Sequence, residues 1–179
     1  MLQANGTPMS SMTFYIQALG SVKFQLEDPG PQAKSGWCQV FAAQPISGIL
    51  VYQTVDAGQV LAEATVLPSV RNRKFSLITP QLGSPTDIGL ALANPEDQSA
   101  VVTLKRYTSD GLMIAETNLV LGSGEQSAKF VSQFFPSNIA QLEGRIEISS
   151  MHNIVGVGLI FQTNSQGFLF TTLPIVALP

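Results

Sequence analysis

The sequence has one cysteine, one histidine and few charged residues. Lys and Arg number 9 and Asp and Glu number 12 among 179 residues, which gives a formal net charge of -3. The basic residues are dispersed apart from Arg71, Arg73 and Lys74, so we expect no nucleic-acid partner. A single cysteine excludes an intrachain disulfide, and one cysteine with one histidine excludes a structural zinc site built from thiolates and imidazoles.

Long hydrophobic segments are also missing. The longest apolar run, residues 154–161, is about a third to a half as long as a membrane-spanning helix, so it predicts a buried strand and no membrane insertion. Residues 1–23 lack the basic and apolar regions of a signal peptide, so we expect none in this chain. Hydrophobic residues make up 45% of the chain and charged residues 12%, which excludes disorder driven by charge.

The chain contains an internal repeat. Residues 36–48 align without a gap with residues 144–156. Shorter matches continue the alignment on both sides: 5–6 with 110–111, 22–24 with 128–130, 52–54 with 161–163, and 65–68 with 171–174.

The repeat predicts two units of unequal completeness. The second copy opens with residues 75–106, which have no counterpart in the first copy. We therefore expect residues 1–70 to form an incomplete β-sandwich module that lacks its leading strands. Residues 75–179 are expected to form a complete β-sandwich module.

Local patterns are typical of antiparallel β structure. Asn5-Gly6 and Asp110-Gly111 predict two-residue hairpin turns, in which both positions have positive φ. Strands are predicted at 101–104, 117–121 and 145–149, because these segments are β-branched or alternate with period two. The short apolar stretch 130–135 is the one helix-like segment and allows a single turn. The sequence therefore predicts an all-β antiparallel β-sandwich.

The alternation also predicts the core. Cys38 aligns with Ile146, which alternates with the polar Arg145 and Glu147, so Cys38 is expected to point inward as an inert thiol. The full expected core is Phe24, Cys38, Val40, Leu104, Phe130, Ile146, Ile148 and Leu159.

A series of segments resembles a known kind of module. The segments are 89–95, 110–111, 130–136, 144–161 and 171–174. Together they resemble immunoglobulin-like or fibronectin-like modules repeated in large exported proteins of soil bacteria. The resemblance implies an immunoglobulin-like fold of about one and a half tandem modules and an extracellular or cell-surface location. It carries no site residues across, because its motifs are turn and core residues.

Trp37 and Phe41 are the candidate ligand-binding residues. By the same alternation they occupy the face that carries Arg145 and Ser149 in the second copy. Two aromatic rings on an outer β-face provide a platform for a sugar ring or a protein partner. The alternative is that the second copy or the linker covers them within the chain. The missing leading strands also leave an open sheet edge, so we expect a homodimer formed through that edge.

Candidate catalytic and metal-binding residues are few. His152 is the single histidine, and its repeat partner is Gln44 in a bend, where a surface histidine is expected. Asp56, Asp87 and Asp97 lie in expected loops, without the spacing of a tight calcium loop. Loop carboxylates at one end of a sandwich can still gather around calcium and activate water.

These observations suggest two functions. A third possibility is that the chain is a fragment without a role of its own. The first is a non-catalytic binding or structural module of a secreted or cell-surface bacterial protein, which associates with itself, a glycan or a protein and needs no cofactor. The alternative is a small hydrolase of an ester, lactone or glycoside, assisted by a divalent cation such as calcium. The absence of catalytic motifs favours the first.

Overall fold

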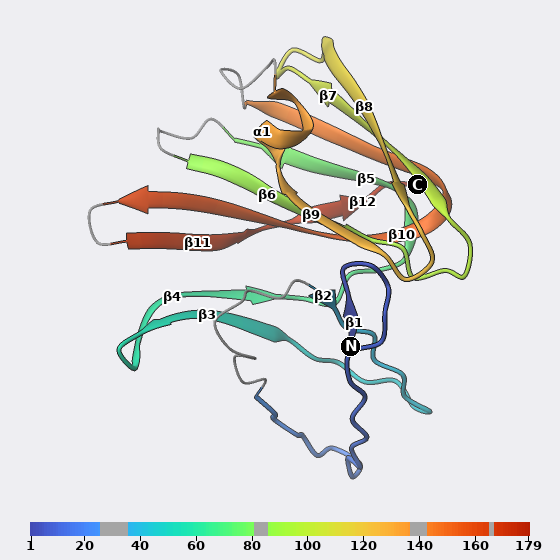
Figure 1. Ribbon diagram of the computed structural model, residues 1–179, viewed down its shortest axis with the longest axis vertical. Helices are drawn as coiled ribbons and strands as arrows, with labels where there is room; N and C mark the ends of the chain where they lie inside the picture. The colour runs from blue at the N-terminus through green and yellow to red at the C-terminus, as the bar shows by residue number, and fades with distance from the viewer. Residues whose placement is uncertain (26–35, 81–85, 137–142, 165–166) are drawn as a thin grey trace.

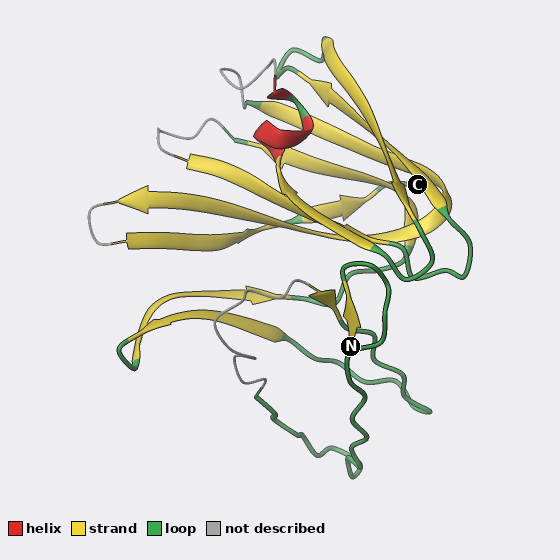
Figure 2. Cartoon of the chain, in the orientation of Figure 1, coloured by secondary structure: helices red, strands yellow, loops and turns green. Residues whose placement is uncertain are grey.

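The structure is a computed structural model that describes residues 1–25, 36–80, 86–136, 143–164 and 167–179. It is all-β, and its sheets are antiparallel (Figures 1 and 2). Its elements are β1 (Leu2–Gln3), β2 (Gly36–Trp37), β3 (Leu50–Asp56), β4 (Gln59–Val66), β5 (Asn72–Thr79), β6 (Thr86–Ala93), β7 (Ala100–Tyr107), β8 (Met113–Leu121), β9 (Gln126–Phe130), α1 (Val131–Phe134), β10 (Gly144–Asn164), β11 (Gly167–Leu173) and β12 (Ile175–Ala177). No helix in these ranges is long and apolar enough to cross a membrane.

Strand β10 connects two layers of the C-terminal part of the chain. It has 21 residues and an irregularity between Ser149 and Ile154. Its first part lies between β5 and β7, in a layer with the order β12-β5-β10-β7-β8. Its second part lies between β11 and β6, in a layer with the order β11-β10-β6-β9. Figure 1 shows the two layers on either side of the bend in β10, an arrangement that fits a β-sandwich.

The core lies between these layers and follows from the alternation of side chains along each strand. Leu104, Ile146 and Ile148 are fully buried, so their prediction as core residues is confirmed. Leu90 and Leu92 of β6 join the same cluster from the second layer. Val131, Phe134 and Phe135 pack into this cluster from the single helical turn, which forms where the sequence predicts it.

Leu159 and Phe130 are half-buried rather than central. Alternate residues of the second part of β10, such as Ile154, point toward the first layer, so Leu159 lies on the opposite face of the second layer. Phe130 pairs opposite Gly89 and packs edge-on against Phe161, with ring centroids 5.2 Å apart. These side chains contribute to a second, outer contact surface of the layer.

Both predicted hairpin turns occur, but with a different backbone geometry. Gly6 and Gly111 have φ of +78° and +87°, whereas Asn5 and Asp110 do not have positive φ. In the first turn, the N–H of Gln3 donates to the carbonyl of Thr7 at 2.8 Å, and the N–H of Gly6 donates to the carbonyl of Gln3 at 3.0 Å. In the second turn, the N–H of Thr108 donates to the carbonyl of Leu112 at 2.9 Å, and the N–H of Gly111 donates to the carbonyl of Thr108 at 3.1 Å. The prediction of a two-residue type I′ turn is therefore wrong, because each loop has three residues between the two that are paired.

Three predicted core residues of the first copy are exposed. Phe24 is 51% exposed, Val40 is 69% exposed and Cys38 is also exposed. The prediction was wrong because β2 ends at Trp37, so no strand carries the alternation through Cys38 and Val40. Alternation determines which side chains share a face, but a second layer has to cover that face before they are buried.

Asn94 is a buried polar residue that fixes the end of the second layer. Its side-chain Nδ2 lies within hydrogen-bond distance of three carbonyl oxygens, and its Oδ1 accepts the N–H of Glu96 at 3.0 Å. The three carbonyls belong to Gln98 at 2.6 Å, Leu121 at 3.1 Å and Gly122 at 3.0 Å. Asn94 therefore joins the β6–β7 loop to the β8–β9 turn, and buried amides that are this fully bonded are costly to remove.

Replacing Asn94 by alanine is expected to lower the free energy of unfolding by about 2 to 4 kcal/mol, because several buried backbone groups lose their partners. Chemical denaturation measures this change. Asn118→Ala is the matched control, since Asn118 accepts a single exposed hydrogen bond from Thr103, and it should cost less than about 0.5 kcal/mol. Equal losses for the two variants would contradict this role of Asn94.

Candidate interaction surface

The hairpin β3–β4 in the first copy pairs in the same register as β10–β11 in the second. Val51 is opposite Thr65 in the first hairpin, and Ile160 is opposite Thr171 in the second. The sequence alignment equates these positions, since it matches 52–54 with 161–163 and 65–68 with 171–174. The two hairpins can therefore be compared residue by residue.

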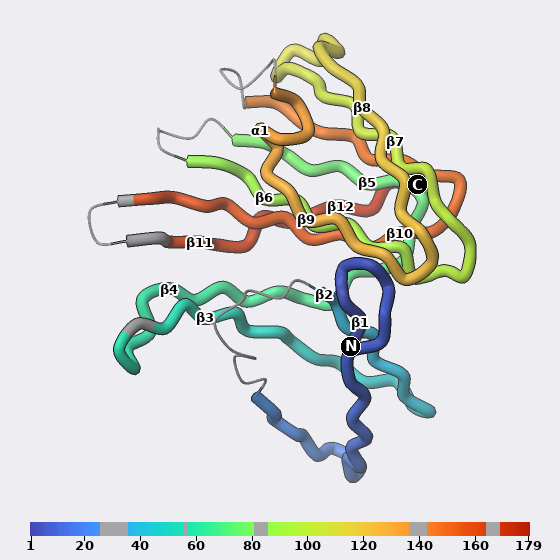
Figure 3. Tube along the Cα trace, viewed as in Figure 1, coloured from blue at the N-terminus to red at the C-terminus, as the bar shows by residue number. Residues whose placement is uncertain are grey.

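One face of the first hairpin is docked on the rest of the chain. Buried side chains alternate along β4 at Ala62, Ala64 and Val66. In Figure 3, β4 lies beside β11, and the Thr172 hydroxyl donates a hydrogen bond to the carbonyl of Thr65. Alternate burial on a strand that contacts another sheet indicates that this face is the one turned toward the second copy.

The opposite face of the hairpin is exposed and apolar. Leu67 is 69% exposed, whereas its counterpart Leu173 is 9% exposed in the core of the second copy. Val51 is also exposed, although its counterpart Ile160 packs against that core. The difference arises because the second copy has a covering layer, which contains β5 and β7, and the first copy has none among the described residues.

The outer edge of β3 is also unpaired. Within the described ranges, β4 is the one ladder partner of β3. The corresponding part of β10 has β11 on one side and β6 on the other, with β6 paired from Val155↔Ala93 to Gln162↔Thr86. We call this edge, together with the exposed side chains around it, the hairpin surface. Its side chains are Ile49, Val51, Val55, Leu61 and Leu67.

The amount of exposed surface is large for a chain of this size. The chain exposes 11764 Å², whereas a compact monomer of 19.1 kDa exposes about 8,400 Å². Of the 28 large hydrophobic side chains that are exposed among the described residues, 20 lie before residue 71. Most of the exposed large hydrophobic side chains among the described residues therefore belong to the first copy.

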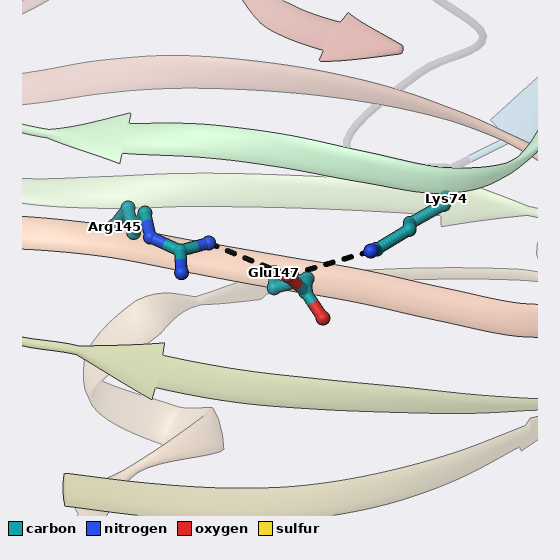
Figure 4. A network of polar contacts seen from close by, with 3 residues as sticks. All are labelled: Lys74, Arg145 and Glu147. Atoms are coloured by element: carbon teal, nitrogen blue, oxygen red, sulfur yellow. Dashed lines mark hydrogen bonds and ion pairs between the residues drawn. The ribbon is translucent and has the colours of Figure 1, made fainter. Parts of the chain in front are cut away.

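The polar side chains described on this face of the hairpin include the pair Gln53 and Glu63 and the exposed Thr65. Gln53 Nε2 donates a hydrogen bond of 2.6 Å to Glu63 Oε2 across the two strands. The outer face of the first layer differs, because there Glu147 lies 3.8 Å from the Lys74 amine and 3.4 Å from the Arg145 guanidinium (Figure 4). The Arg145 guanidinium also lies 4.1 Å from the centre of the Tyr107 ring. That face is charged and solvated, whereas the hairpin surface is mainly aliphatic.

Trp37 attaches the first copy to the second. It is half-buried, and its ring Nε1 donates a hydrogen bond of 2.8 Å to the carbonyl of Gly124. In the same turn, the N–H of Gln126 donates to the carbonyl of Ala4 at 2.7 Å. Phe41 is 80% exposed, so it remains accessible to a ligand. The role of Trp37 and Phe41 in ligand binding stays a prediction.

Cys38 lies near Tyr52 of β3. Burial raises the pKa of the Tyr52 phenol above its usual value, and the negative charge of the Cys38 thiolate adds to this rise. The thiol is exposed beside the hairpin rather than enclosed in a core.

The candidate catalytic and metal residues do not meet. His152 is half-buried in the irregular part of β10, where its backbone N–H donates to Ser150 Oγ at 3.2 Å. Asp87 lies in β6 and accepts hydrogen bonds from the Ser132 hydroxyl and from the N–H of Ile88, while Asp97 is exposed in the β6–β7 loop. The Asp56 side chain is outside the described residues. Among the described residues, no three His, Cys, Asp or Glu side chains form a group suited to a metal ion.

Of the three comparisons with known proteins, the comparison with solved structures is the one that finds similar chains. No family model and no curated protein matches the chain. A crystal structure of Thermotoga maritima 1070 is 12% identical with a TM-score of 0.49, and it matches 60% of this chain and 95% of its own. The Anabaena sensory rhodopsin transducer is 18% identical with a TM-score of 0.42, and it matches 51% of this chain and 98% of its own. At these TM-scores neither similarity supports an argument about function.

Replacing Trp37 by alanine is expected to loosen the attachment of the first copy and leave the core of the second intact, because the hydrogen bond from its ring to Gly124 joins the two parts. Amide hydrogen exchange should become faster around β1, β2 and Gln126, while the amides of β7 keep their protection. Phe41→Ala is the control and should change neither region. Uniformly faster exchange, including β7, would instead show that Trp37 supports the global fold.

Proposed function

We propose that this chain is a non-catalytic binding module of a secreted or cell-surface bacterial protein, and that it binds a protein partner through the hairpin surface. One observation carries the proposal: the first hairpin is uncovered, although its counterpart in the same register is covered. At equivalent positions, the Leu67 residue is 69% exposed and the Leu173 residue is 9% exposed. Apolar surface of this kind is a usual site of protein association.

The chemistry of the surface favours a protein over a glycan. Its defining side chains are valine, leucine and isoleucine, and Gln53 is paired with Glu63, which leaves Thr65 as a further exposed polar side chain on the same face. Sugar sites generally combine an aromatic ring with several free hydrogen-bonding groups, whereas protein interfaces have an apolar centre with little charge. The free edge of β3 offers unpaired backbone groups as well, which a strand of a protein partner can use.

The location and the module type rest on the resemblance in the sequence. Immunoglobulin-like modules in exported proteins are usually arranged in tandem, and the register shared by the two hairpins supports an incomplete first module followed by a complete second one. The observed layers of residues 72–177 fit the sandwich that this resemblance implies. Under this proposal the module binds a partner and does not catalyse a reaction.

An apolar fluorescent dye such as anilinonaphthalene sulfonate tests whether this surface is available. The unmodified chain should bind the dye, and Val51→Lys/Leu61→Lys should lose a large part of the emission, because two ammonium groups interrupt the apolar face. The matched control is Val101→Lys/Val120→Lys, since these two valines are an exposed cross-strand pair on β7 and β8. Equal emission losses in the two variants, or no dye binding to the unmodified chain, would contradict the proposal.

A further inference from the structure

We infer that the partner of the hairpin surface is a second copy of this chain, whose own β3 pairs antiparallel with β3 across a two-fold axis. This inference rests on the proposed function and adds the identity of the partner and the position of the contact. Antiparallel pairing of a strand with its own copy is self-complementary, because each strand presents the same backbone donors and acceptors to the other.

The repeat shows that this type of edge pairs with an antiparallel strand. In the second copy, the corresponding edge of β10 binds β6 over Val155 to Gln162. β6 cannot serve the first copy as well, since its other edge is occupied by β9. Among the described residues, no other strand pairs with the outer edge of β3, which leaves this edge for a strand from another molecule.

The composition of β3 leaves its edge unprotected. Edge strands usually carry lysine, proline or another charge that prevents pairing with other molecules. β3 reads Leu-Val-Tyr-Gln-Thr-Val-Asp, with no charged residue before Asp56 and no proline. By contrast, β8 carries Glu116 near its centre and β9 carries Lys129. The edge strands β11 and β12 also lack charged residues, but β11 contacts β4 and β12 has three residues, so β3 is the longer edge that is open to pairing among the described strands.

One register gives the longest overlap. With Gln53 on the two-fold axis, all seven residues of β3 pair, and Val51 of each copy lies opposite Val55 of the other. Tyr52 then lies opposite Thr54, so every cross-strand pair in the centre joins residues that favour β structure, without opposed like charges. The resulting sheet has the order β4-β3-β3-β4, and four strands are more stable than an isolated hairpin.

The edge of β3 offers seven residues for pairing, and the register brings apolar side chains of the two copies together at each Val51–Val55 pair. The valine pairs also bury part of the apolar area that each hairpin exposes alone.

Cysteine cross-linking tests both the partner and the register. In a Cys38→Ser background, Gln53→Cys should form a covalent dimer under mild oxidation, because the two-fold axis places this position opposite itself. Asn118→Cys, an exposed position on the edge strand β8, is the control and should cross-link several-fold less. A mixture of Val51→Cys and Val55→Cys chains should cross-link more than either chain alone, which specifies the register. Circular dichroism confirms that each variant keeps its fold.

The outcomes separate the inference from the proposed function. Light scattering should give twice the mass of 19.1 kDa at concentrations where Gln53→Cys cross-links. A chain that stays monomeric at every concentration while its hairpin surface binds the dye would overturn the second copy as partner and leave the proposed function standing. A dimer that cross-links through Asn118→Cys and not through Gln53→Cys would also overturn the second copy as partner at β3, whereas an unmodified chain that binds no dye would overturn the proposed function.

Discussion

The need to cover each apolar face of a β-sheet determines the rest of this structure. In the second copy that need is met by β10, which runs through both layers and holds them together along one strand of 21 residues. Leu77, Ile146, Leu90 and Leu92 are buried between the layers as a result. The residues of the helical turn pack into the same core, and the Asn94 side chain bonds backbone carbonyls of the loops beside it.

The first copy lacks the strands that would meet the same need. Its hairpin has the register of its counterpart, so the local sequence is sufficient to form the pair of strands. In the part of residues 1–70 that the structure describes, no strand corresponds to β5, β6 and β7, and there the opposite face and the outer edge of the hairpin are exposed. The same kind of residue is therefore part of a core at Leu173 and part of an exposed apolar surface at Leu67. Burial is decided by the neighbouring layer and not by the hairpin itself.

The sequence predicted the class of fold and much of the second copy. Period-two alternation located Ile146 and Ile148 correctly, because a complete set of neighbouring strands turns one face of β10 inward. The same reasoning failed for Cys38, Val40 and Phe24, because it assigned to the first copy the neighbours that exist in the second. The position of the turn at Gly111 was predicted correctly, but its type was not. The Asp-Gly pair does not determine how many residues the loop contains. The open sheet edge of the first copy was expected from the unmatched segment 75–106, but the exposed aliphatic side chains of β3 and β4 beside it were not named, because alternation alone does not say which face lacks a covering layer.

The central claim is that β3 is an edge strand that becomes a central strand when a second copy binds. Amide hydrogen exchange measured at low and at high protein concentration tests it most directly, because exchange reports on each backbone group. The account predicts that amides of Leu50–Asp56 exchange more slowly as the concentration rises, while amides of β8 keep the same rates. Exchange in β3 that does not depend on concentration, in a chain that remains folded, would contradict it.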